Sequence, residues 1–190
     1  MLTGQIRNSI IILYILEKID LPLPVSQLEQ ATLIHMDYFV FQETIHHLVD
    51  IKYIEGTAPR GDQGQDAQGE GAQLRYSPTD EGLQTLEYFE RELAADVRAS
   101  LNEFVLANHQ RIKKDYESTS HFFKNFGTED YSVKCALYDD DHLLMELNIT
   151  VDSANQARLI CDNWKANITK LYGNILENLI DTSYKDNTTE

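Results

Sequence analysis

Three histidines, His35, His46 and His47, are the side chains of this 190-residue chain whose type best suits metal binding. Helical zinc sites place two histidine ligands at positions i and i+4 on one face, and this trio lacks that spacing. No cysteine lies near them in the sequence to complete a tetrahedral set of ligands. We therefore predict that these histidines face solvent or nucleic acid, and that the chain has no metal site.

Two other segments resemble ligand-binding loops in composition only. Asp139, Asp140 and Asp141 are followed by leucines where a calcium loop has further ligands and a glycine, so we interpret them as a charged hairpin turn. The glycines of residues 61–71 lack the Gly-Lys-Ser/Thr ending of a phosphate-binding loop. We therefore expect no cofactor.

The two cysteines, Cys135 and Cys161, are predicted to be neighbours in the core, one on a strand and one on the last helix. No histidine and carboxylate accompany them, and isolated buried thiols usually serve packing. We predict no catalytic residue, and therefore that the chain is not an enzyme. Two cysteines also exclude a disulfide framework, which fits a reducing compartment.

The charge balance argues against attraction to polyanions. The chain carries 31 acidic and 16 basic residues, a formal net charge of −15 at pH 7. A field of this sign attracts neither DNA nor anionic lipid, so any nucleic-acid binding needs a local basic patch. The longest apolar run, residues 10–16, is shorter than the ~18 residues of a transmembrane helix. We expect a cytoplasmic protein that does not bind membranes.

Helical patterns and turn signals alternate at the start of the chain. Apolar residues at helical spacing predict a helix over about residues 6–16, which Pro22 and Pro24 end. Ser26 begins a short second helix. Asp37 is the predicted N-cap of a third helix, because a short acidic side chain there can accept the first free backbone N–H groups.

A hairpin and a long helical pattern follow. Residues 53–55 and 74–76 are β-prone, and the glycine- and glutamine-rich stretch between them cannot pack in a core, so we predict a hairpin with a long tip. Thr79 is the predicted N-cap of the next helix, whose first turn is acidic. Residues 80–117 contain no proline, which predicts one very long helix or two nearly collinear ones.

The C-terminal part has the alternation of an antiparallel sheet. Residues 131–138 and 143–151 alternate apolar and polar side chains, and the acidic turn joins them as a hairpin. Residues 121–126 suit a preceding strand. Ser153 is the predicted N-cap of a final helix that reaches about Leu179. The fold class predicted for the chain is therefore α+β, with a small C-terminal antiparallel sheet covered by a terminal helix.

Two passages resemble the winged-helix fold. Residues 48–56, Leu-Val-Asp-Ile-Lys-Tyr-Ile-Glu-Gly, are similar to the passage in which the third helix ends in Leu-x-x-x-Gly-Leu-Ile, with Lys52 in place of the glycine. Residues 76–82, Tyr-Ser-Pro-Thr-Asp-Glu-Gly, resemble the Tyr-x-Leu-Thr-x-x-Gly passage that leads many bacterial regulators from wing to next helix, with Pro78 replacing the leucine. The resemblance implies an N-terminal winged helix-turn-helix domain.

Longer passages at residues 13–23 and 156–165 look like an uncharacterised bacterial family that joins a winged helix to an α/β C-terminal unit. Its members are described as transcriptional regulators by analogy with the fold. The resemblance spans nearly the whole chain. Together with the patterns above, it predicts a winged-helix domain over residues 1–90 with a mobile wing at 57–73, a linking and dimerisation helix over 91–117, a small antiparallel α/β unit over 118–181 and a flexible tail over 182–190.

A winged helix reads DNA with its third helix in the major groove, while its second helix and wing contact phosphates. The residues placed there by the motif register are Gln27, Phe39, Gln42, His46, His47, Arg60 and Arg75. Glu43 stands where related recognition helices often carry arginine, and no Lys or Arg lies between Lys18 and Lys52. The predicted binding of double-stranded DNA is therefore weak and salt-sensitive, unless a homodimer doubles the contacts.

The apolar seam of the linking helix predicts that homodimer, with packing on the C-terminal sheet as the alternative. The dimerisation candidates are Leu86, Phe89, Leu93, Val97, Leu101 and Phe104. We expect the C-terminal unit to mediate dimerisation or to bind a small-molecule effector or a protein partner.

A second interpretation treats the acidic third helix as a protein-contact surface. Phe39 and Val40 then offer apolar contact to a partner, while Tyr38 is expected to be buried beneath the second helix. The chain would be a protein–protein interaction module that keeps the winged-helix fold without binding DNA.

Overall fold

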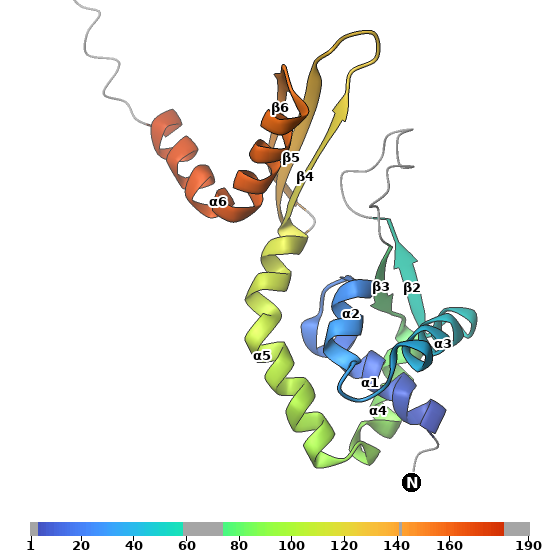
Figure 1. Cartoon of the computed structure of the whole chain (residues 1–190). Coiled ribbons are helices and arrows are strands. Elements are labelled where there is room, and N and C mark those ends of the chain that lie inside the picture. Colours follow the sequence, from blue (N-terminus) through green and yellow to red (C-terminus); the bar gives the residue numbers. More distant parts are fainter. Residues whose placement is uncertain (1–3, 59–73, 141, 181–190) are drawn as a thin grey trace, which may run out of the picture. The chain divides into compact units, whose positions relative to one another are not determined.

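The computed structural model describes residues 4–58, 74–140 and 142–180 (Figure 1). The chain divides into two compact units, with the division between Tyr116 and Glu117. The first unit combines several helices, and the second a single helix, with a three-stranded antiparallel sheet, so the predicted α+β class is confirmed. The long helix predicted as a linker lies almost entirely within the first unit.

The first unit is built around its first helix. Its elements are α1 (Gly4–Ile19), β1 (Leu23–Pro24), α2 (Val25–Thr32), α3 (Tyr38–Asp50), β2 (Ile54–Thr57), β3 (Arg75–Pro78), α4 (Asp80–Phe89), the 3-10 helix η1 (Glu90–Glu92) and α5 (Ala95–Glu117). Every residue from Ile10 to Leu16 is buried, and α1 contacts α2, α3, α4 and β3. A helix that is apolar all round requires such enclosure.

The sheet of the first unit has the strand order β1-β3-β2. Strands β2 and β3 form the predicted hairpin, with Ile54 opposite Pro78 and Thr57 opposite Arg75. Sequence patterns do not predict β1, which pairs Leu23 with Tyr76 and Pro24 with Arg75. A two-residue strand that contains a proline has no alternation from which it could be recognised.

Both predicted caps of the first unit are confirmed. Asp37 Oδ1 accepts the N–H of Val40 at 3.0 Å, and Thr79 Oγ1 accepts the N–H of Gly82 at 3.2 Å. The Thr79 hydroxyl also lies 2.7 Å from the carbonyl oxygen of Lys52, to which it donates. The start of α4 is thereby tied to the segment that leads from α3 into β2.

The prediction of one long helix or two collinear helices over residues 80–117 is wrong. The chain leaves helical geometry at Leu93, which is extended (φ −66°, ψ 133°) and buried in the core. Figure 1 shows α4 and α5 meeting at an angle. Because the break depends on a tertiary contact, no proline or glycine marks it. Tyr14 then donates a 2.9 Å hydrogen bond to Asn102 Oδ1 and fastens α5 to α1.

This packing accounts for the residues predicted to form a dimer seam. Leu86, Leu93, Val97 and Leu101 are buried in the core of the first unit, and Phe89 and Phe104 pack against it. Their apolar surface is covered within one chain. Most of the apolar surface of the predicted seam is therefore occupied by packing within the first unit.

The second unit is a sheet with one helix on it. Strands β4 (Ser118–Lys124), β5 (Tyr131–Asp139) and β6 (His142–Val151) pair antiparallel in that order, and α6 (Ala154–Ile180) covers one face. Ser153 Oγ accepts the N–H of Gln156 at 3.3 Å and caps α6 as predicted. Val133 and Cys135 from the sheet pack against Ala157, Cys161, Trp164 and Ile168 of the helix.

Candidate interaction surface of the third helix

Helix α3 has a buried face and an open face. Phe41, Thr44, Ile45 and Leu48 are buried and hold the helix against α1. The opposite positions, in i, i+3 and i+4 relation, carry Phe39, Gln42, Glu43, His46 and Asp50. Among these only Gln42 is half-buried, and the other four are exposed. The helix therefore presents a continuous row of side chains to solvent.

The chain entering α3 exposes four large apolar side chains, which we name the corner patch: Leu33, Ile34, Tyr38 and Phe39. Their exposed fractions are 48%, 82%, 49% and 81%. The rings of Tyr38 and Phe39 lie edge to face, with centroids 5.8 Å apart. Tyr38 is not buried beneath α2, contrary to the expectation, because the N-cap at Asp37 begins the helix with Tyr38 directed outward.

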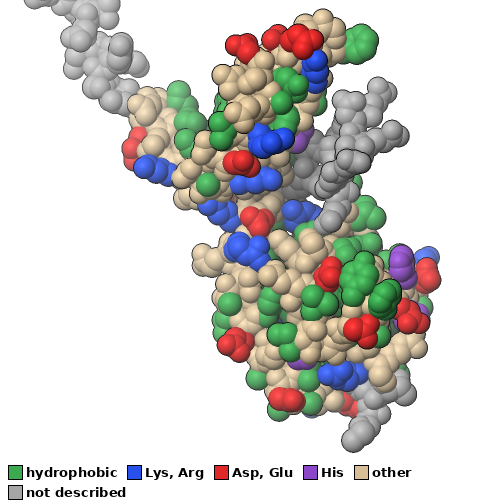
Figure 2. Space-filling model, viewed as in Figure 1, with side chains coloured by type: hydrophobic (Ala, Val, Ile, Leu, Met, Phe, Trp, Pro, Cys, Tyr) green, Lys and Arg blue, Asp and Glu red, His purple; other side chains and the backbone are tan. Residues whose placement is uncertain are grey.

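The charges on α3 are acidic, and a cation described beside the corner patch is Arg7, which donates to the carbonyl oxygen of His35 at 3.4 Å. Asp37, Glu43 and Asp50 are exposed on or beside α3, and the helix itself contains no lysine or arginine. Figure 2 shows acidic, hydrophobic and histidine side chains together over α3 and the neighbouring strands, with Lys or Arg side chains at the edge of the group. The N-terminus of a helix attracts phosphate through its free N–H groups, but here the Asp37 carboxylate already accepts one of them. Phosphate binding at this end of α3 is therefore disfavoured.

The residues predicted to contact DNA lie in several places. Phe39, Gln42 and His46 share the open face of α3, and His47 is half-buried beside them. Gln27 lies on α2, half-buried, with its Oε1 enclosed and without a hydrogen-bond partner. Arg60 is outside the described residues.

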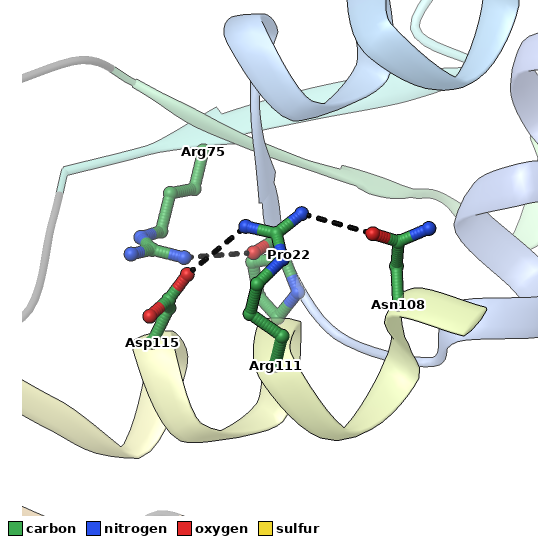
Figure 3. A network of polar contacts seen from close by, with 5 residues as sticks. All are labelled: Pro22, Arg75, Asn108, Arg111 and Asp115. Atoms are coloured by element: carbon green, nitrogen blue, oxygen red, sulfur yellow. Dashed lines mark hydrogen bonds and ion pairs between the residues drawn. The ribbon is translucent and has the colours of Figure 1, made fainter. Parts of the chain in front are cut away.

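Arg75, the remaining candidate, lies on β3 and is used within the first unit. Its Nη1 donates to the carbonyl oxygen of Pro22 at 3.2 Å, and its guanidinium lies 5.5 Å from the ring centroid of Tyr116. Figure 3 shows it beside Arg111 of α5, which donates to Asn108 and pairs with Asp115. Arg75 thus joins the sheet to α5, and its replacement would disturb packing as well as any phosphate contact.

His35, between α2 and α3, is partly enclosed. Its Nε2 is buried without a hydrogen-bond partner, while its backbone carbonyl accepts from Arg7 at 3.4 Å. Desolvation, with Arg7 as a lesser cause, lowers the pKa of His35 below 6.5, so the ring is neutral at pH 7. Among the described residues the three histidines form no group with metal-binding geometry.

Two side-chain clusters of the second unit bring together thiols or carboxylates. Burial raises the pKa of Cys135 to about 11 and also raises the pKa of Cys161, so both thiols are protonated and unreactive at neutral pH. Glu117, Asp139 and Asp140 bring carboxylate oxygens within 4.8 Å of one another, but an exposed acidic group of this kind is common without an ion.

A pocket in the first unit has a volume of about 500 Å³ and lies between the end of α1, the segment before β1 and the end of β3. Its polar lining comes from Glu17, Asp20 and Ser77. The enclosed Oε2 of Glu17 lies 2.9 Å from Lys18 Nζ, which neutralises its charge, and Asp20 is exposed.

Sequence reasoning missed Leu33 and Ile34 as parts of an exposed surface. Both fall after the last periodic position of α2 and before the Asp37 cap, where no buried face continues. An apolar pair in such a turn is the signal that could have found them.

A family model described as a domain of unknown function, DUF4364, matches residues 8–179. Comparison with curated proteins and with solved structures finds no match. Within the described residues, no helix is long and apolar enough to cross a membrane.

Proposed function

The chain belongs to the DUF4364 family, and from that premise we propose that its first unit is a protein-docking module whose binding surface is the corner patch with the open face of α3. The observation that carries the proposal is the exposure of Phe39 and Ile34, each more than four-fifths accessible, at the entrance to a helix that contains no lysine or arginine. Isolated exposed apolar residues need no explanation, but several in one turn and helix end indicate a contact surface.

The chemistry of the patch favours protein over DNA. Affinity for duplex DNA comes mainly from cations that displace counterions from phosphates, with one contact for each neutralised phosphate. The open face of α3 supplies Glu43 and Asp50 instead, and Arg75 is engaged with Pro22 and Tyr116. Aromatic side chains at the centre of a patch are the typical anchors of protein interfaces.

The acidic residues on and beside α3 indicate the charge of a partner segment that would bind there. A segment that covers Tyr38 and Phe39 with apolar side chains brings its flanking residues close to Asp37, Glu43 and Asp50. Lysine or arginine at those flanks would be attracted and acidic residues repelled. We infer a partner segment with apolar anchors and basic flanks.

A peptide selection tests this proposal. A random library of about 12-residue peptides is selected on the immobilised full chain, and enriched peptides are measured against variants by fluorescence anisotropy. We expect apolar–basic peptides whose affinity falls at least about tenfold for Phe39→Ala, the loss typical of a central anchor. The matched control is Tyr88→Ala, because Tyr88 on α4 is also an aromatic residue with 75% exposure. Absence of enrichment, or equal loss in both variants, contradicts the proposal.

A second candidate function, DNA binding as a homodimeric transcriptional regulator, is favoured by the order of elements. Three helices followed by a hairpin, with β1 added to its sheet, is the arrangement expected of a winged helix. Selection from a random duplex pool at about 50 and 200 mM salt tests it, since electrostatic and specific binding separate with salt. An enriched motif that Gln42→Ala weakens would favour this function over protein docking. Arg75 is kept unchanged because it is part of the packing.

A further inference from the structure

Strand β6 forms one edge of the three-stranded sheet of the second unit (Figure 1). It pairs with β5 from Asp139 opposite His142 to Tyr131 opposite Val151. In the described part of the chain, no other strand pairs with β6. Alternate residues of an antiparallel strand direct their backbone N–H and C=O groups to opposite sides, so every second residue of β6 directs both groups away from β5. These groups form an open sheet edge, which a further extended backbone can pair.

The sequence of β6 does not protect this edge. Open edges are commonly protected by a lysine, a proline or a bulge in the edge strand. β6 is 10 residues long and contains no lysine, arginine or proline. The register shift between Leu137 and Tyr138 lies near the start of β6 and leaves the pairing from Met145 to Val151 regular. The other edge strand, β4, is shorter, ends at Lys124 and is covered more extensively by α6. Of the two edges, β6 is therefore better suited to accept another strand.

The apolar core of the second unit is only partly closed at β6. Val133 and Cys135 of β5 are buried, whereas Ile149 and Leu147, which lie directly opposite them on β6, are half-buried. Side chains directly opposite each other share one face of a sheet, and here it is the face that α6 covers. A further strand beside β6 would cover Ile149 and Leu147 with apolar side chains at its own alternate positions.

The other face of β6 indicates the charge of such a strand. Glu146, Asn148 and Thr150 alternate with the half-buried residues and are exposed. Glu146 accepts from Asn148 Nδ2 at 2.7 Å, and no ion pair between described residues includes it. Its neighbour on β5 is the uncharged Ala136. Opposite charges directly across two strands stabilise the pairing and like charges destabilise it, so lysine or arginine suits the position beside Glu146.

We propose that β6 binds an extended segment of a partner protein as a fourth strand, with apolar side chains on the α6 side and lysine or arginine opposite Glu146. Backbone hydrogen bonds supply the affinity in binding of this kind, and the alternating side chains supply the specificity. A second copy of the chain suits the edge less well, because two chains of net charge −15 repel each other. The proposal is independent of the corner patch, which belongs to the first unit.

The probe is the peptide acetyl-Lys-Val-Thr-Val-Lys-Val-Thr-amide, whose valines share one face of a strand and whose lysines and threonines share the other. It is titrated to about 1 mM into the labelled full chain, and amide shifts and hydrogen exchange are followed by NMR. We expect saturable binding, with exchange slowed at those alternate residues of β6 whose N–H groups point away from β5.

Two N-methylated versions of the probe are matched controls for the backbone hydrogen bonds. One is methylated on the valines, and the other on the lysines and threonines between them. Both keep the side chains of the parent, but only one set of N–H groups can face β6. One version should therefore bind at least about tenfold more weakly, and the other should bind as the parent does.

Glu146→Lys tests the charge argument. This variant should bind the probe at least about threefold more weakly, and should bind more tightly a peptide in which glutamates replace the lysines. Glu177→Lys, on an exposed position of α6, changes the net charge by the same amount and should leave probe binding unchanged. Circular dichroism of Glu146→Lys should match the wild type, because the side chain is exposed.

Several results would overturn the proposal. No saturable binding, or equal binding of the two N-methylated peptides, shows that β6 does not accept a strand. Slowed exchange confined to β4 or to the corner patch shows that the probe binds elsewhere. Outward amides of β6 that are already protected in the free chain show that a second copy occupies the edge. Phe39→Ala should bind the probe as the wild type does, which separates this proposal from the docking function.

Discussion

Substitution of Gly82 tests the packing of the first unit, because a methyl group added at this position would overlap backbone atoms. A Cβ added at Gly82 would overlap the carbonyl oxygen of Tyr53 and lie 3.1 Å from Leu13 Cδ2. The same carbonyl accepts the N–H of Thr79 at 3.0 Å. Tyr53 therefore cannot move away from the new methyl group without weakening the hydrogen bond that leads the chain into α4.

The expected effect of Gly82→Ala is the sum of opposing terms. Alanine is the better helix former by roughly 1 kcal/mol, which favours the variant. Overpacking costs about 1–3 kcal/mol, and weakening the hydrogen bond costs about 1 kcal/mol more. We expect the free energy of unfolding to fall by roughly 1–3 kcal/mol.

Gly173→Ala is the matched control, because Gly173 is also inside a helix but a Cβ there meets nothing within 4 Å. Only the propensity gain remains, so this variant should be more stable by about 0.5–1 kcal/mol.

Urea unfolding followed by circular dichroism reports on the helices of both units, and fluorescence of Trp164, the single tryptophan, reports on the second unit alone. The reasoning is refuted if Gly82→Ala is as stable as the wild type, or if both substitutions change stability in the same direction.

Three further predictions concern single side chains. Asp37→Ala should lower stability by about 1 kcal/mol through loss of the α3 cap, measured by urea unfolding with Asp50→Ala as a neutral control. Burial lowers the pKa of His35, so the unfolded chain is protonated first and the free energy of unfolding should fall as pH drops below 6.5. An unfolding series in which His35→Gln keeps the same dependence on pH would contradict this. Burial raises the pKa of Cys135 to about 11, so the unfolded thiol ionises first and the free energy of unfolding should fall as pH rises above 9.0. A thiol reagent that reacts as fast with the folded chain as with the urea-unfolded chain would contradict this protection of Cys135.

The sequence predicts the elements that depend on local signals. Asp37, Thr79 and Ser153 cap helices as expected, because a cap depends only on the residues of one turn. Alternation likewise predicts β5 and β6. The break at Leu93 and strand β1 depend on partners distant in the sequence, the core and β3, so no local pattern contains them.

In the candidate site, too, local sequence signals predict some features, while others depend on contacts distant in the sequence. The helical register of α3 predicts that Phe39, Glu43 and His46 face outward, and all three are exposed. Val40, Gln42 and His47, which the same register places outward, are half-buried. The exposure of Tyr38 was not predicted, because it depends on how the turn after α2 directs the chain into α3. The role of Arg75 in joining β3 to α5 could not be predicted without the tertiary structure.

The central claim is that α3 and the corner patch bind a protein segment. Its most direct test is amide chemical-shift mapping of the labelled chain, titrated with a selected apolar–basic peptide and, separately, with a random duplex at about 150 mM salt. The account predicts peptide-induced shifts centred on Leu33, Ile34, Tyr38 and Phe39 and no saturable shift with the duplex. Saturable shifts along α3 with the duplex, or peptide shifts confined to other elements, would contradict it.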